Sequence, residues 1–125
     1  MERAMEEILK EIQKLVPEVL GVIVASDEGL PMGYSISRSL SIQDPIIIAG
    51  LISSASAMME NVLREFKDND FQMVFTSGEE YAILVGKVEG FYVAFIADAR
   101  VKLGPLFMEF RKNKERFAEI LKAYK

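Results

Sequence analysis

The chain has 125 residues, half of them hydrophobic, and a formal net charge of −4, with no cysteine and no histidine. This length fits one domain, residues 1–125, with a sizeable core, and the periodic placement of the apolar residues excludes a disordered chain. The missing cysteine and histidine exclude disulfides, thiol nucleophiles and the commonest metal ligands, and the acidic balance argues against binding to nucleic acid.

Residues 2–16 are predicted to form an amphipathic helix, because apolar residues recur there at spacings of three and four with Glu and Lys between them. Pro17 ends this helix, since a proline inside a helix lacks the N–H donor and clashes with the preceding turn. The stretch has neither the apolar segment nor the small-residue cleavage site of a secretory signal. We therefore expect a cytoplasmic protein.

The next two elements are predicted to form a β-hairpin. Residues 19–26 are apolar on both alternating faces, as expected of a strand buried between two layers. Turn-forming residues follow at 27–29, and large and small side chains then alternate over 32–37. Pro31 and Gly33 are typical of an edge position, so the second strand is placed on one rim of the sheet.

The longest predicted helix covers residues 44–66 and follows a linker at 38–43. Asp44 is its expected N-cap, and Pro45 suits a first turn, where a missing N–H costs nothing. One broad arc carries large apolar residues that we expect to be buried: Ile48, Leu51, Ile52, Met59, Val62, Leu63 and Phe66. The opposite arc carries small, uncharged residues. A membrane span is excluded on the criterion of about 18 or more uncharged apolar residues.

Three strand-like segments follow, at 71–77, 81–88 and 91–98, joined by connections short enough for hairpins. They predict an antiparallel meander, with the 71–77 strand on the second rim and the 91–98 strand beside the strand at 19–26. A last amphipathic helix is predicted over 102–123. The expected fold class is α+β, with the order α-β-β-α-β-β-β-α and a five-stranded, mostly antiparallel sheet.

Two features predict association with a second chain. Small residues three and four apart let another backbone approach closely, and the rim strand at 71–77 lacks the charges, proline and glycine that usually protect an exposed edge. A small-residue arc that is merely tolerated at the surface is the alternative. We predict a two-fold homodimer whose interface comprises Gly50, Ser53, Ser54, Ala57 and Asn61 of the helix and Phe71, Met73 and Phe75 of the strand.

The sequence carries no catalytic signature. Gly86-Lys87 is followed by Val88 rather than by Ser or Thr, so this pair is not part of a phosphate-binding loop. The serines of the long helix have no histidine to activate them, and the paired carboxylates lie in predicted turns. We predict that the protein is not an enzyme and has no catalytic residues, no cofactor and no metal.

The element order, the hairpin at 22–30 with its turn glycine Gly29, the long helix rich in Ala and Ser, and the strand at 91–96 span nearly the whole chain. In this combination the chain resembles the Roadblock/dynein light chain family. The resemblance implies a profilin-like three-layer sandwich, with one helix on one face of the sheet and two on the other. It also implies a homodimer joined through the central helix and the third strand.

For function, the resemblance implies a non-enzymatic, homodimeric regulator or scaffold that binds a Ras-like small GTPase and has no nucleotide site of its own. The alternative is a structural subunit of a motor-like or filament complex without a GTPase partner. The expected partners are a second copy of the chain and a Ras-like small GTPase. Neither nucleic acid nor direct insertion into a membrane is expected.

Overall fold

The computed structural model describes residues 1–41 and 44–124. Its elements follow in the order α1 (Glu2–Leu15), β1 (Val19–Ala25), β2 (Pro31–Ile36), α2 (Pro45–Glu65), β3 (Met73–Ser77), β4 (Tyr81–Val88), β5 (Phe91–Asp98) and α3 (Leu103–Lys122). The predicted helices and strands are confirmed. The largest difference is at β3, which begins at Met73 instead of residue 71. The predicted linker at 38–43 includes Ile42 and Gln43, which lie outside the described residues.

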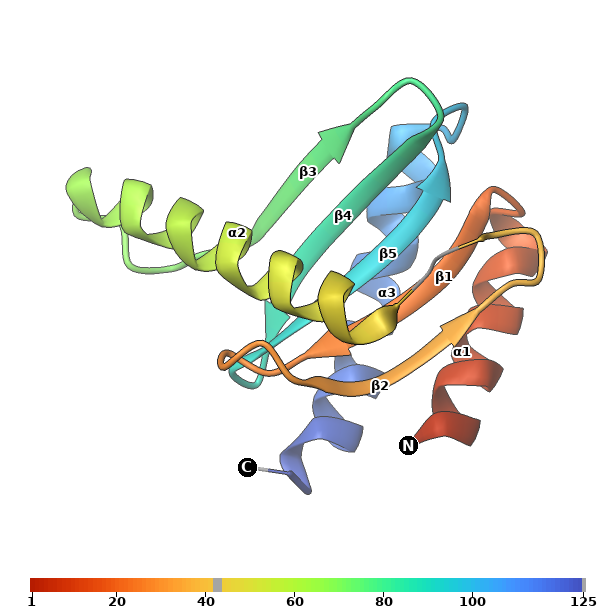
Figure 1. Cartoon of the computed structure of the whole chain (residues 1–125), viewed down its shortest axis with the longest axis horizontal. Coiled ribbons are helices and arrows are strands. Elements are labelled where there is room, and N and C mark those ends of the chain that lie inside the picture. The colour runs from red at the N-terminus through yellow and green to blue at the C-terminus, as the bar shows by residue number, and fades with distance from the viewer. Residues whose placement is uncertain (42–43, 125) are drawn as a thin grey trace.

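The strands form one antiparallel sheet in the order β2-β1-β5-β4-β3 (Figure 1). β1 and β5 lie side by side at the centre and are buried along nearly their whole length, because their residues are apolar on both faces. β2 and β3 form the two rims, as predicted. Both faces of this sheet need a covering layer. The rim strand β3 follows directly on the segment that returns from α2.

α1 and α3 cover one face of the sheet, and α2 crosses the other (Figure 1). The larger core lies under α1 and α3, where the rings of Phe95, Phe110 and Phe117 pack together. Gly86 of β4 allows this close packing, since a Cβ at this position would lie 2.2 Å from Phe110 Cζ. These layers confirm the predicted profilin-like α+β arrangement.

The first half of α2 is fixed by its cap and by the β1–β2 turn. The Asp44 side chain accepts a 2.9 Å hydrogen bond from Ile46 N, as expected of an N-cap. Further along, Ser53 Oγ donates to the Asp27 carbonyl at 3.1 Å. A Cβ on Gly29 would lie 3.4 Å from Gly50 Cα, so the turn and the helix approach closely because neither glycine has a side chain.

The expected orientation of α2 is wrong for much of its large apolar arc. The side chains buried against the rest of the chain are Ala49, Ile52, Ser53, Ser56 and Glu60. Four members of the arc that was expected to be buried are exposed instead: Leu51, Met59, Val62 and Phe66. The physical reason is that the small residues let α2 lie close to the chain's own β1–β2 turn, which rotates the larger side chains outward.

Candidate association surface

α2 presents a row of large apolar side chains to solvent, which we call the α2 row. It consists of Ile47, Leu51, Met58, Val62 and Phe66, with exposed fractions between 47% and 78%. Spacings of four and seven residues place these side chains along one side of the helix. A contiguous apolar patch of this kind is typical of a surface that binds another protein.

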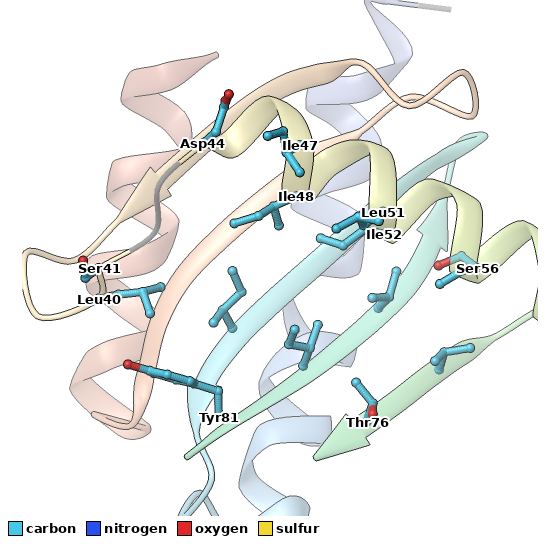
Figure 2. Close-up of a pocket in the computed structure, with 15 residues that line it drawn as sticks. Leu40, Ser41, Asp44, Ile47, Ile48, Leu51, Ile52, Ser56, Thr76 and Tyr81 are labelled. Atoms are coloured by element: carbon cyan, nitrogen blue, oxygen red, sulfur yellow. The ribbon is translucent and has the colours of Figure 1, made fainter. Parts of the chain in front are cut away.

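An apolar groove of about 620 Å³ lies beside this row, between α2 and the sheet (Figure 2). α2 packs mainly on β1, β2 and β5, so the faces of β3 and β4 form the floor of the groove. Asp44, Ser41 and Thr76 contribute polar atoms to its lining. Most of the lining is apolar, from Leu40, Ile47, Ile48, Leu51, Ile52, Ala55, Val74, Ile83, Val85 and Ile96. Its shape and chemistry suit apolar side chains of a partner.

The β3 strand borders the same side of the molecule. Among the described strands β3 pairs only with β4, so the backbone groups along its other edge have no strand partner there. Val74 and Thr76 line the groove, whereas the Phe75 ring packs on the other face against Phe107, with 5.9 Å between ring centroids. The α2 row, the groove and the free β3 edge together form the candidate association surface.

The residues predicted for the helix part of the interface divide between two sides of α2. Ser53 is buried and bonded to the β1–β2 turn, and Gly50 packs on Gly29. These two residues make contacts within the chain, and their contact with a second chain stays a prediction. Ser54 and Asn61 are exposed and Ala57 is half-buried, and their contact with a second chain stays a prediction.

The residues predicted for the strand part divide in the same way. Phe71 precedes β3 and is buried, with its ring edge-on to Tyr92 at a centroid distance of 6.3 Å, and its part in an interface stays a prediction. Met73 and Phe75 are half-buried against the core under α3. Their part in an interface through the backbone edge of β3 stays a prediction.

Sequence reasoning missed the α2 row and the groove. Periodicity identifies apolar residues but does not distinguish those that face the chain's own sheet from those that face a partner. A signal was nevertheless present, because α2 has both a large apolar arc and a small uncharged arc and therefore no ordinary solvated face. The structure buries part of each arc, with Ile52 of the large arc and Ser53 of the small arc both buried.

A buried ionic group lies under the second half of α2, and we call it the Glu60 cluster: Glu60, Lys87 and Tyr92. Tyr92 OH donates to Glu60 Oε1 at 2.5 Å, and Lys87 Nζ donates to Oε2 at 3.2 Å. Arg64 Nη2 lies 3.5 Å from the same carboxylate. One carboxylate thereby connects α2 to both β4 and β5.

Electrostatics keeps Glu60 ionised. Burial acts to raise its pKa, but hydrogen bonds from Tyr92 and Lys87 and the charges of Lys87 and Arg64 outweigh this and lower the pKa of Glu60 overall. Burial and the neighbouring Glu60 carboxylate raise the pKa of the Tyr92 hydroxyl. At neutral pH the pair is therefore an anionic acceptor and a neutral donor. Nothing in the sequence indicated this contact, because Tyr92 is 32 residues from Glu60 along the chain.

Of the described helices, α2 alone is long and apolar enough to cross a membrane by length and composition, with a mean hydropathy of 1.6. The exclusion of a membrane span from the sequence was therefore too strict. The core helix of a soluble protein passes the same test. Insertion would break the hydrogen bonds of Ser53 and Glu60 to the rest of the chain, so these bonds favour a protein partner for α2.

Within residues 1–41 and 44–124, no group of three or more Asp, Glu, His or Cys is placed to hold a metal ion. The ionic clusters that the structure describes are paired internally, as in the 2.8 Å bridge between Arg100 and Asp98. The Arg100 hydrogen bonds hold the pKa of Asp98 at about 2.

The family model for the Roadblock/LC7 domain matches residues 5–97. No curated protein sequence matches the chain. A solved structure described as MglB with tetrameric arrangement is 19% identical, covers 97% of this chain and 89% of its own, and has a TM-score of 0.83. Myxococcus xanthus MglB is 18% identical over 95% of each chain, with a TM-score of 0.81. Acanthamoeba castellanii profilin II is 8% identical over 94% and 96%, with a TM-score of 0.62. At these identities the likeness shows the fold.

Proposed function

This chain belongs to the Roadblock/LC7 domain family, and we propose that it is a non-enzymatic, homodimeric regulator or scaffold that binds a Ras-like small GTPase. The family assignment supports a regulator role. The observation that carries the proposal is the α2 row beside an apolar groove, on a face of the sheet that α2 covers only in part. Such a surface favours association over exposure to water.

The first partner in this proposal is a second copy of the chain. α2 is roughly 31 Å long, at about 1.5 Å per residue, and its C-terminal end extends past β3 (Figure 1). A two-fold axis that is perpendicular to the sheet and passes beside the free edge of β3 would join two sheets and carry this end of each α2 over the groove of the other copy. Met58, Val62 and Phe66 would then lie against apolar side chains of the partner.

Burial of the α2 rows supplies the main driving force for the dimer in this proposal. Fully burying a large apolar side chain contributes roughly 1.5–3 kcal/mol. Association costs about 4–15 kcal/mol in lost translational and rotational freedom. In the proposed dimer, this cost is offset by the α2 rows of two copies, by the grooves that receive them and by the hydrogen bonds of a joined β3 edge.

The second partner is the GTPase, which would lie across the platform formed by the two α2 helices. A symmetric platform of this size favours two copies of the chain with one GTPase, and two GTPases on equivalent sites is the alternative stoichiometry. Arg64 is the basic residue of α2, and it is held by Glu60 and Asn61. We therefore propose that any stimulation of hydrolysis comes from repositioning loops of the GTPase, without an arginine supplied to the nucleotide.

The test is to mix the purified chain with Ras-like GTPases of the same organism, loaded with GDP or with a non-hydrolysable GTP analogue. Light scattering coupled to size exclusion then gives the mass of each complex. The proposal predicts a complex with at least one of these GTPases that depends on the nucleotide and contains two copies of the chain. A lack of binding in both nucleotide states would refute the GTPase partner, and assembly of the chain alone into larger polymers would favour a filament subunit.

A further inference from the structure

The second half of α2 is attached to the sheet by a charged side chain. Within residues 57–65, all of which the structure describes, Glu60 is the only buried residue. Leu63 is half-buried and packs near Phe71 and Tyr92. The large side chains of Met58 and Val62 are exposed. This half of the helix, which carries Met58 and Val62 of the α2 row, therefore has few apolar contacts to fix its position.

Glu60 can fix that position because both of its carboxylate oxygens are engaged from the sheet. Tyr92 of β5 donates to Oε1 at 2.5 Å, and Lys87 of β4 donates to Oε2 at 3.2 Å. Lys87 Nζ also lies 5.4 Å from the centroid of the Tyr92 ring, and the Phe71 ring packs on Tyr92. Hydrogen bonds to a carboxylate are directional, whereas apolar contacts tolerate sliding, so this cluster defines one height and one rotation of the helix.

A second anchor lies on the same side of α2. Ser53 precedes Glu60 by seven residues, about two helical turns, and donates to the Asp27 carbonyl at 3.1 Å. Met58 and Val62 each lie two residues from Glu60, which places them about 200° around the helix axis. Two anchors on one side therefore determine where the α2 row lies on the other.

We propose that Glu60 is a positioning residue for association: through Tyr92 and Lys87 it holds α2 at the height and rotation that fit the α2 row to a second copy. This inference rests on the proposed homodimer. A buried carboxylate is tolerated only when it is paired, so the loss of one donor to Glu60 should weaken the attachment of this half of α2 to the sheet. The role differs from general stabilisation because it concerns the geometry of one surface.

The experiment compares Glu60→Gln with Glu65→Gln, a matched change at an exposed position of the same helix. Tyr92→Phe removes one hydrogen bond to Glu60 and keeps the ring. Sedimentation equilibrium gives the dissociation constant of each dimer. We expect Glu60→Gln and Tyr92→Phe to raise it on the order of tenfold, which corresponds to about 1.4 kcal/mol. Glu65→Gln should leave it unchanged.

Hydrogen exchange then separates positioning from global stability. It is measured on Glu60→Gln and Glu65→Gln, each combined with Met58→Glu. The Met58→Glu change is expected to keep the protein monomeric because it places a charge in the α2 row. Amides of residues 57–65 should exchange faster in Glu60→Gln than in Glu65→Gln. The exchange rates of amides in the sheet should be the same in both variants. Gly86→Ala serves as a structural control, since it perturbs the opposite face of the sheet.

The outcomes are distinct. A wild-type dimer whose dissociation constant is unaffected by Glu60→Gln would overturn the positioning role and leave the proposed function intact. The positioning role would also be overturned if Gly86→Ala and Glu60→Gln lower the free energy of unfolding equally and raise the dissociation constant equally. The weaker dimer would then reflect general stability. A monomeric wild type would overturn the proposed homodimer, and with it a role for Glu60 in association.

Discussion

The Tyr92 hydroxyl donates a 2.5 Å hydrogen bond to the Glu60 carboxylate and so joins the central strand β5 to the helix that carries the exposed apolar row. The bond lies beneath α2, where Lys87 also reaches the carboxylate. It places an ionised group in the layer between helix and sheet, beside the apolar cluster of Ile52, Val85 and Ala94. The stability of the α2 layer should therefore depend on the charge of one side chain.

The first prediction is that Glu60 adds an acid-labile contribution to stability. Its folded pKa is lowered from the ordinary value of 4.5, so its contribution is fully present above pH 4.5 and is lost as the pH falls through the folded pKa. Other carboxylates titrate in the same range, so the quantity to measure is a difference. The free energy of unfolding should fall more steeply below pH 4.5 in the wild type than in Glu60→Gln. If the free energy of unfolding falls with pH at the same rate in both proteins, this prediction is contradicted.

The second prediction concerns the face of the sheet that α3 covers. Gly86→Ala would place a Cβ 2.2 Å from Phe110 Cζ, so the ring or the helix must move. We expect a loss of about 1–3 kcal/mol, the usual effect of overpacking a core. Urea unfolding measures this loss. Gly104→Ala is the control, since a Cβ there meets nothing within 4 Å, and an equal loss in both variants would refute the packing argument.

The fold could be predicted because its signals are local. Pro45 and the Asp44 cap mark the start of α2, and the apolar character of β1 and β5 on both faces places them at the centre of the sheet. The family resemblance, confirmed by the match over residues 5–97, rests on the same patterns. Short-range chemistry determines each of these features, so one sequence is enough.

The association surface could be predicted only in part, because it depends on which neighbour each arc of α2 meets. Leu51 and Ile52 are adjacent and both strongly apolar, yet Leu51 is exposed and Ile52 is buried. The deciding contact is the close approach of Gly50 to the turn at Gly29, a tertiary feature. The pairing of Glu60 with Tyr92 is likewise long-range, and a glutamate in a helix otherwise indicates a solvated position.

A third prediction follows from the place of Arg64. Its guanidinium bonds Asn61 and Glu60, so it is engaged within its own helix. Arg64→Ala should leave both GTPase binding and any stimulation of GTP hydrolysis within about twofold of the wild type, because an arginine finger is typically worth a factor of about 10³–10⁵ in rate. Hydrolysis by the reconstituted complex under single-turnover conditions tests this. Loss of stimulation with binding intact would show that Arg64 acts on the nucleotide.

A fourth prediction is that the purified chain does not bind GTP. Gly86 and Lys87 lie in β4, where Gly86 packs against Phe110 and Lys87 pairs with Glu60, so neither is free to hold phosphates. Titration calorimetry with GTP and magnesium should give no heat of binding. Saturable binding at micromolar concentrations would contradict a role in which the nucleotide belongs to the partner.

The most direct test of the account compares two methionines. Met58 in the α2 row and Met108 on α3 are each 68% exposed, so Met58→Glu and Met108→Glu make the same chemical change at equal exposure on opposite faces of the sheet. Light scattering coupled to size exclusion, at tens of micromolar protein, measures the mass of each variant. We predict a dimer for the wild type and Met108→Glu and a monomer for Met58→Glu. A monomeric wild type, or a dimer that persists in Met58→Glu but dissociates in Met108→Glu, would contradict association through α2.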